Sequence, residues 1–286
     1  MRNNTEVLHW LFETEAFRVS MPEQPFWYTS GKFGPFYINT HFLFGNEKLA
    51  TELLAAIDEA LAFPLALPRL IGKRCMKQYH NSELYSKIIQ ISVEHVKDLD
   101  FDYVSGGERR DFFFSYPVAE LLHKEHLTIL KNGRCFLSSN QFREIREIKA
   151  EELKGRKVLH VADLVTEASS YFRAWLPSLS FVGAEITDSL SIVDRKQGGR
   201  ESLLDRGITL KSLIQIDEEF FQEAMNLGKI NEKQYEQLLS FINDPDKFMK
   251  DFLHEHPDFL ENEENKDEKT AERVARFRSL KLFEVE

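Results

Sequence analysis

A run of acidic and hydroxyl-bearing residues follows an apolar segment in the second half of the chain. Residues 158–170 read VLHVADLVTEASS, so that Asp163 ends the apolar segment and Thr166, Ser169 and Ser170 precede an expected helix. Backbone N–H groups and hydroxyls at the beginning of a helix suit a phosphate group. The same residue types are ordinary helix caps, so the run alone leaves a phosphate loop and a simple cap as alternatives.

The elements around this run predict the scaffold that would position it. Apolar runs and turn signals predict strands near 101–105, 127–130, 157–162, 185–193 and 209–216, with helices near 114–125 and 167–179. This alternation indicates an α/β fold with a mostly parallel sheet and helices on both faces. The charged stretch from 131 to 155 is long for a connection and is expected to be a mobile loop or a hood over a site.

The segments on either side of this core have other patterns. Upstream, the sequence predicts a helix over 3–18, an extended hairpin over 27–40, helices capped by Asn46 and Ser82 that end near 61 and 98, and a proline-containing connection over 63–74. Downstream, helices are expected near 217–227, 231–242, 246–254 and 267–280. The acidic run over 261–268 is expected to be a solvated connection or helix face.

Composition excludes several classes of protein. The chain has 286 residues, 42% of them hydrophobic, and 24 phenylalanines, which argues against disorder, and it has no long apolar run for a membrane span. A net charge of −10 opposes nonspecific binding to nucleic acid. Cys75 and Cys135 form neither a disulfide framework nor a zinc motif. His254 and His256 would face different directions on a helix, and His123 and His126 have helical spacing but no nearby cysteine or carboxylate pattern, so neither pair predicts a metal site. The N-terminus has no signal core, so a cytoplasmic location is expected.

Four segments, in order, resemble the type I phosphoribosyltransferases, and most of all orotate phosphoribosyltransferase. Residues 158–170 resemble the motif that binds phosphoribosyl diphosphate (PRPP), and FDYVSGG (101–107) resembles the strand leading to the diphosphate loop. TSGKFGPFY (29–37) is similar to the N-terminal hairpin of that enzyme, and VDRKQGG (193–199) to its Asp-Arg-x-x-Gly-Gly signature. The resemblance implies a phosphoribosyltransferase-like domain over 1–216, with residues 1–45 as a hood, and an acidic helical extension over 217–286.

The resemblance also implies roles for individual residues. Asp163 would contact the ribose hydroxyls, and the 5-phosphate would be held by Thr166, Ser169 and Ser170, since carboxylates and hydroxyls suit these partners. Arg195 would pair with the orotate carboxylate. Phe36 and Tyr37 would wall the base, and Arg109 and Arg110 would act with Asp163 as catalytic residues, facing a Mg-bound diphosphate. The remaining implied binding residues are Lys32, Gly106 and Gly107.

Each of these residues also has a plainer explanation. Phe36 and Tyr37 could belong to a core or interface strand, because aromatic residues favour strands. Arg195 could form a surface ion pair with Asp194 or Glu201. The glycines and arginines of 106–110 could form an ordinary turn with solvated side chains.

Departures from the motif leave two functions open. The family has two adjacent acids where this chain has Ala162 and Asp163, and Thr-Gly-Gly where it has Glu167, Ala168 and Ser169. The first hypothesis is an enzyme that transfers ribose 5-phosphate from PRPP to a pyrimidine-type base, orotate, with Mg bound to the diphosphate. The second is a noncatalytic nucleotide-sensing or protein-binding module. The resemblance further implies a homodimer.

Overall fold

The computed structural model describes residues 2–280, which form two units. The first unit consists of Met1–Ala16 and Asn39–Ile216, and the second of Phe17–Ile38 and Asp217–Glu286. One boundary between the units lies at 216/217, and the N-terminal hairpin belongs to the unit that contains the C-terminal helices. The expected helix over 3–18 is α1 (Arg2–Glu13), which ends before strand β1 (Phe17–Val19).

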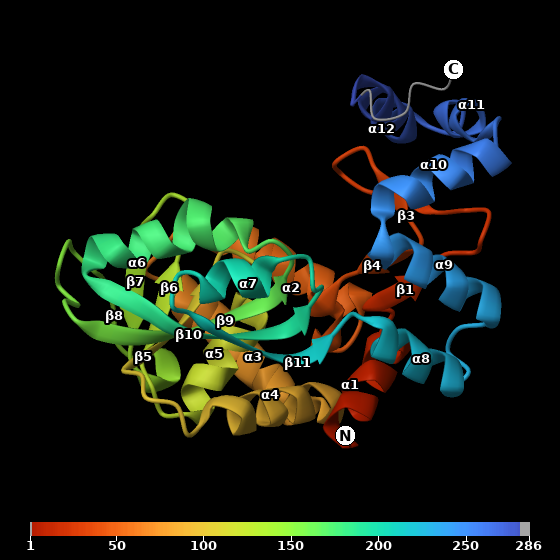
Figure 1. Cartoon of the computed structure of the whole chain (residues 1–286). Helices are drawn as coiled ribbons and strands as arrows, with labels where there is room; N and C mark the ends of the chain where they lie inside the picture. Colours follow the sequence, from red (N-terminus) through yellow and green to blue (C-terminus); the bar gives the residue numbers. More distant parts are fainter. Residues whose placement is uncertain (1, 281–286) are drawn as a thin grey trace. The chain divides into compact units, whose positions relative to one another are not determined.

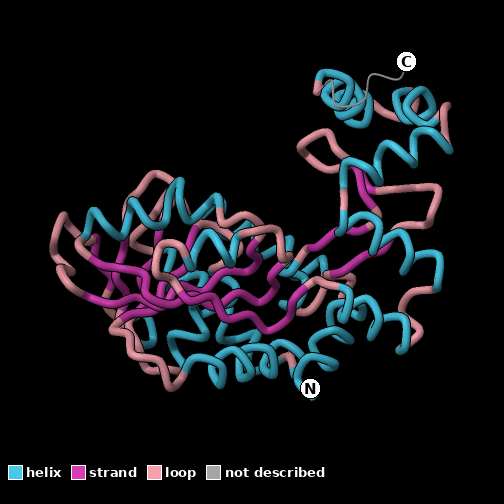
Figure 2. Tube along the Cα trace, viewed as in Figure 1, coloured by secondary structure: helices cyan, strands magenta, loops and turns pink. Residues whose placement is uncertain are grey.

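A sheet of seven strands forms the centre of the first unit (Figures 1 and 2). Its order is β11-β10-β9-β5-β6-β7-β8, and the pairs from β11 to β6 are parallel. The strand bounds are β5 Tyr103–Gly107, β6 His126–Ile129, β7 Cys135–Ser138, β8 Ile145–Glu147, β9 Arg156–Val165, β10 Ala184–Asp194 and β11 Thr209–Gln215. The expected α/β fold with a mostly parallel sheet is confirmed.

Strand order explains where a site can form in this sheet. The chain adds β6 on one side of β5 and then β9, β10 and β11 on the other, so the direction of winding reverses between β5 and β9. Ligands of open α/β sheets bind at the carboxyl ends of the strands at such a switch point, because the two following loops diverge there. The loops after β5 and β9 carry the two groups of candidate phosphate-binding residues.

Helices cover both faces of the sheet. Figure 1 shows α3, α4 and α5 on one face and α6 and α7 on the other. Asn46 and Ser82 cap α2 and α4 as expected, since each side chain accepts a backbone N–H in the first turn. The helical bounds, with 3-10 and π segments as η, are η1 Thr40–Phe44, α2 Glu47–Ala60, α3 Leu67–Asn81, α4 Glu83–Val96, α5 Phe112–Leu121, η2 Asn140–Phe142, η3 Tyr171–Trp175, α6 Leu176–Val182 and α7 Gly199–Leu204.

Two sequence-based expectations for the first unit are wrong. The stretch over 63–74 is not a connection, because α3 begins at Leu67; Pro68 lies in its first turn, where a proline costs no hydrogen bond. The stretch over 131–155 is part of the sheet rather than the expected mobile loop, because β7 and β8 pair antiparallel with each other and β7 pairs with β6; the expected hood stays a prediction. Charged side chains in that stretch pair across the hairpin, as in Arg134 and Glu147, whose Nε and Oε1 atoms are 2.7 Å apart.

The second unit has an aromatic core. Short strands pair as β1 with β4 and β2 with β3, and the rings of Phe33, Phe252, Phe259 and Phe277 pack together. Within the acidic run, Glu263 is buried and accepts a hydrogen bond from Trp27 Nε1 at 2.9 Å, so this residue is not solvated as expected. The bounds are β2 Phe26–Trp27, β3 Phe33–Gly34, β4 Phe36–Ile38, α8 Glu218–Asn226, α9 Glu232–Asn243, α10 Pro245–Glu255, α11 Phe259–Glu264 and α12 Glu268–Ser279.

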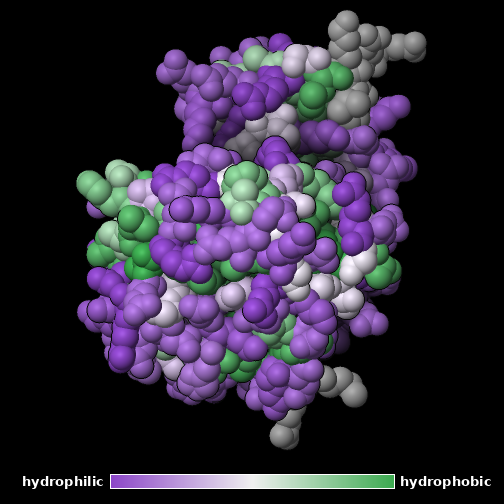
Figure 3. Space-filling model, turned by 90° about the vertical axis from the view of Figure 1, so that its left-hand side faces the viewer, coloured by the Kyte–Doolittle hydropathy of each residue, from purple (hydrophilic) through white to green (hydrophobic). Residues whose placement is uncertain are grey.

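The surface and the helix lengths agree with the composition. On the face shown in Figure 3, hydrophilic residues predominate and hydrophobic residues occupy smaller areas between them. Among residues 2–280, no helix is both long enough and apolar enough to cross a membrane.

Candidate active site at the switch point of the sheet

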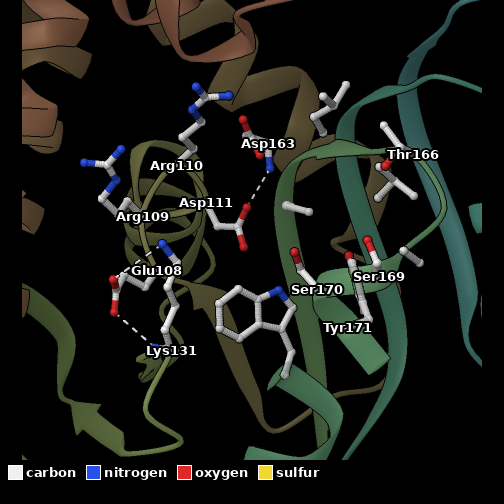
Figure 4. Close-up of a pocket in the computed structure, with 15 residues that line it drawn as sticks. Glu108, Arg109, Arg110, Asp111, Lys131, Asp163, Thr166, Ser169, Ser170 and Tyr171 are labelled. Atoms are coloured by element: carbon white, nitrogen blue, oxygen red, sulfur yellow. Dashed lines mark hydrogen bonds and ion pairs between the residues drawn. The ribbon is translucent and has the colours of Figure 1, made fainter. Parts of the chain in front are cut away.

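A cavity of about 250 Å³ lies between the loops that follow β5 and β9. Figure 4 shows Glu108, Arg109, Arg110 and Lys131 on one side of it and Thr166, Ser169 and Ser170 on the other, with Asp111 and Asp163 between them. The lining residues are Glu108, Arg109, Arg110, Asp111, Lys131, Ala162, Asp163, Leu164, Val165, Thr166, Ala168, Ser169, Ser170, Tyr171 and Trp175. The structure thus brings the two expected groups together, cations facing hydroxyls.

The two glycines before the arginines are required by packing. A Cβ atom at Gly107 would lie 2.3 Å from the Trp175 ring, and one at Gly106 would lie 2.2 Å from Ser115 Oγ. Neither glycine lines the cavity itself. Without side chains, Gly106 and Gly107 allow the end of β5 to lie close to the neighbouring helices, and the arginines that follow can then reach the cavity.

The arginine side of the cavity carries three cations, Arg109, Arg110 and Lys131, and Lys131 Nζ lies 3.8 Å from Glu108 Oε1. Arg109 forms an ion pair with Asp58 of α2, which orients its guanidinium. Buried beside the arginines is His41, whose pKa falls to about 3 because of its burial and the positive charges of Arg110 and Arg109. His41 is therefore neutral at physiological pH and adds no charge of its own. An anion is the ligand that this wall favours.

Asp163 and Asp111 form a buried acidic pair between the two walls. Asp163 is 8% exposed and Asp111 is 7% exposed. Burial, together with the negative charge of Asp111, raises the pKa of Asp163 to about 8, although Arg110 acts in the opposite direction. Asp163 therefore holds its proton at neutral pH.

The loop after β9 carries the hydroxyl groups. Thr166, Ser169 and Ser170 line the cavity, whereas Glu167 is exposed and is not among the lining residues. Ala168 has a φ of +57°, in the left-handed region that glycine adopts more easily. Ala168 therefore adopts the left-handed conformation that a glycine of the motif would adopt, and the loop turns at the same place.

Replacement of Ala168 by glycine should stabilise the protein. A left-handed alanine is strained by about 1 kcal/mol or more, and removal of Cβ relieves this strain, so the net gain in the free energy of unfolding should reach about 1 kcal/mol. Urea unfolding measures it. The matched control, Ala55→Gly in the exposed face of α2, should destabilise by about 1 kcal/mol because that residue is helical. A loss of stability in both variants would contradict the loop conformation.

Comparisons with known proteins agree with this geometry. Over 140 residues, the chain is 37% identical to the orotate phosphoribosyltransferase of Pyrococcus furiosus, covering 48% of this chain and 71% of that protein. The chain belongs to the phosphoribosyltransferase family. It is also 26% identical over 146 residues to the adenine phosphoribosyltransferase of Caldicellulosiruptor bescii, covering 48% of this chain and 82% of that one. No family model matches the chain.

A solved structure shares the fold. UMP synthase of Leishmania donovani superposes with a TM-score of 0.54 at 16% sequence identity, over 84% of this chain and 42% of that one. This chain thus spans less than half of that longer protein. The type I phosphoribosyltransferase fold extends over most of the chain.

The Asp-Arg-x-x-Gly-Gly segment of this phosphoribosyltransferase supports the loop after β9. The N–H of Gly199 donates to Thr166 O at 2.9 Å, and the N–H of Arg195 donates to Val165 O at 2.9 Å. A Cβ atom at Gly199 would lie 2.3 Å from Thr166 O. The Asp194 carboxylate accepts from Arg200 Nε at 3.0 Å, and Arg195 is not among the residues that line the cavity.

The hairpin residues of the family resemblance lie in the second unit. Phe36 is 2% exposed, and its ring packs 5.3 Å from Phe17 and 5.6 Å from Phe241, in the manner of a core strand. Tyr37 is half-buried. Lys32 Nζ lies 2.8 Å from Asp246 Oδ1 on α10. None of the three is among the residues that line the cavity.

Sequence reasoning missed four residues around the site of this phosphoribosyltransferase. Asp111 and Lys131 line the cavity, as does Trp175, and His41 lies near the arginines. Asp111 had a usable signal, since it directly follows the two arginines. Lys131 reaches the site because β6, which ends just before it, pairs with β5. His41 and Trp175 lie in helical segments that packing on the sheet brings to the site.

Proposed function

We propose that this protein transfers ribose 5-phosphate from PRPP to a ring nitrogen of a pyrimidine-type base, with orotate as the substrate and diphosphate as the leaving group. The observation that carries the proposal is the cavity at the switch point, where three hydroxyl side chains face two arginines and a lysine. PRPP has a phosphate at one end and a diphosphate at the other, so a site with two anion-binding walls matches its charges.

Each wall has a role in this reaction. Thr166, Ser169 and Ser170 would bind the 5-phosphate through hydroxyls and backbone N–H groups. Arg109 and Arg110 would bind the diphosphate and stabilise the charge that it gains as the C1–O bond breaks. Positioning of the two reactants and this electrostatic stabilisation supply the rate enhancement, and no protein nucleophile is needed.

Magnesium would enter with the diphosphate. Among the described residues, no three side chains of the histidine, cysteine or acidic type gather as a metal site, so the protein by itself offers no cage. Asp163 lines the cavity and provides a hard oxygen donor, and Mg²⁺ is commonly bound by one or two carboxylates together with substrate phosphates. The ion would neutralise part of the diphosphate charge.

Similarity to relatives and charge complementarity support orotate as the base. Orotate is supported by the relative from Pyrococcus furiosus, which is more similar than the adenine enzyme. Arg195, in the first unit, is the residue that the family resemblance implies for the base, whereas Phe36 is a core residue of the second unit. A carboxylate on the base would pair bidentately with a guanidinium, which adenine cannot do.

A noncatalytic module that binds PRPP is the second candidate. The raised pKa of Asp163 favours this candidate, because it keeps the carboxyl group neutral near neutral pH. A neutral carboxyl group binds ribose hydroxyls and Mg²⁺ less well than a carboxylate does. Such a module would bind PRPP and release no diphosphate.

Turnover in the presence of different bases tests the proposal. Purified protein with Mg²⁺ and PRPP should release diphosphate when orotate is added, and should do so far more slowly with adenine or without a base. Arg110→Ala should lower kcat/KM by about 100-fold, as for loss of a transition-state charge contact, while Arg156→Ala, which removes an exposed pair with Asp102, should match the wild type. Binding of PRPP without turnover on any base would favour the noncatalytic module.

A further inference from the structure

Asp111 connects the ends of two strands beyond the point where they pair. The ladder between β5 and β9 ends at Ser105 and His160. Further along, Asp111 Oδ2 accepts the N–H of Gly107 and Oδ1 accepts the N–H of Asp163, both at 3.0 Å. One carboxylate therefore bridges the arginine-bearing loop and the strand that leads to the hydroxyl-bearing loop, at the place where they separate to form the cavity.

The same carboxylate lies on the face of β9 that includes Ala162. His160 and Ala162 are two residues apart on a strand, so their side chains point to the same face. His160 Nε2 lies 3.4 Å from Asp111 Oδ2, and Ser105 Oγ is 2.9 Å from His160 Nδ1. A carboxylate at position 162 would project beside Asp111 and meet a like charge in a buried place, whereas the alanine methyl leaves the space free.

We propose that Asp111 is a positioning residue that joins the two anion-binding loops and supplies the second carboxyl group of the site beside Asp163, and that Ala162 is small because Asp111 needs its space. This inference rests on the proposed binding of PRPP. The acid that is missing at position 162 is thus provided by the loop that follows the neighbouring strand β5.

Calorimetric titration of PRPP in Mg²⁺ into the full chain tests this assignment. Asp111→Asn keeps the shape but turns an amide donor toward one of the two N–H groups, so the affinity for PRPP should fall about tenfold or more. Ala162→Asp alone should also weaken binding, because three carboxyl groups then crowd together. The double variant should bind within about threefold of the wild type, because the amide introduced at position 111 can donate to the carboxylate introduced at position 162.

A matched control lies at the other end of the same strands. Asp102 Oδ2 accepts the N–H of Lys157 on β9 at 2.9 Å, which resembles the Asp111 contact but is remote from the cavity. Asp102→Asn should leave the affinity for PRPP within about twofold of the wild type. Circular dichroism and thermal melting establish whether each variant folds.

The outcomes separate this inference from the proposed function. Unchanged affinity in Asp111→Asn, or a double variant that binds no better than Asp111→Asn, would overturn the role of Asp111. If Asp111→Asn does not fold, a folded double variant that binds PRPP supports the role, and a double variant that fails to bind overturns it. A wild-type protein that binds no PRPP overturns the proposed function, and this inference with it.

Discussion

Replacement of Asp163 by asparagine should make the protein more stable at pH 8 and at the same time nearly inactive. Burial and the charge of Asp111 raise the pKa of Asp163 to about 8, so the folded protein holds a proton that the unfolded chain releases near pH 4. Between these values the folded state binds more protons. Its stability therefore falls as the pH rises from about 4 to about 8, by at most about 1.4 kcal/mol per pH unit.

Asparagine removes this dependence because it does not ionise, and its amide can still donate to Asp111. Urea unfolding at several pH values should show a flatter profile for Asp163→Asn than for the wild type, with the largest difference near pH 8. Turnover with PRPP should fall by about 100-fold or more, since the variant lacks the carboxylate for the ribose hydroxyls and Mg²⁺.

Asp102→Asn is the control for this prediction. Asp102 is an aspartate at the amino end of β5, paired with Arg156 at 3.2 Å. Its variant should keep the pH profile of the wild type. A stability profile for Asp163→Asn parallel to that of the wild type between pH 4 and 8 would refute the raised pKa of Asp163.

The second large effect is expected at Gly199. A methyl group there would lie 2.3 Å from Thr166 O and 3.0 Å from Ala168 N, which are backbone atoms that cannot rotate away. Gly199→Ala should therefore displace the hydroxyl-bearing loop, lower the free energy of unfolding by about 1–3 kcal/mol and weaken PRPP binding by at least about tenfold.

Gly207→Ala is the control that distinguishes the steric clash at Gly199 from the backbone strain caused by replacing any glycine of positive φ. Gly207 has a φ of +76°, but no atom lies within 4 Å of the position that a Cβ would take. Only backbone strain of about 1 kcal/mol is therefore expected, and PRPP binding should not change. Equal PRPP affinities for the Gly199→Ala variant and the wild type would show that the loop does not depend on this contact.

The sheet could be predicted from sequence because its strands are short apolar runs bounded by turns. The predicted strands near 101–105 and 157–162 correspond to β5 and β9, and their parallel arrangement follows from the helices between them. Asn46 and Ser82 were also predictable, since a helix cap depends on residues within one turn.

Features that depend on long-range packing could not be predicted in the same way. The hairpin over 17–38 joins the C-terminal helices through aromatic contacts, such as Trp27 with Phe259 at 5.8 Å between ring centroids. A local pattern cannot show a partner that lies so far away in the sequence. The burial of Glu263 could not be predicted for the same reason, because its partner Trp27 lies far away in the sequence.

The candidate site shows the same limit. Arg109, Arg110, Asp163, Thr166, Ser169 and Ser170 all line one cavity, and their binding roles stay predictions. The departures at Ala162 and Glu167 looked more damaging in sequence than in the structure, where Glu167 is exposed and Asp111 lies beside Asp163. The exposure of Glu167 and the position of Asp111 both depend on the direction in which side chains point, and the sequence alone does not give this direction.

The most direct test is a calorimetric titration of PRPP, with Mg²⁺ present, into the whole chain. We expect saturable binding of one PRPP per chain at concentrations below about 1 mM, the usual range for enzyme substrates, and competition by diphosphate. An absence of binding at that concentration, in a protein shown to be folded, would contradict the account of this cavity as a PRPP site.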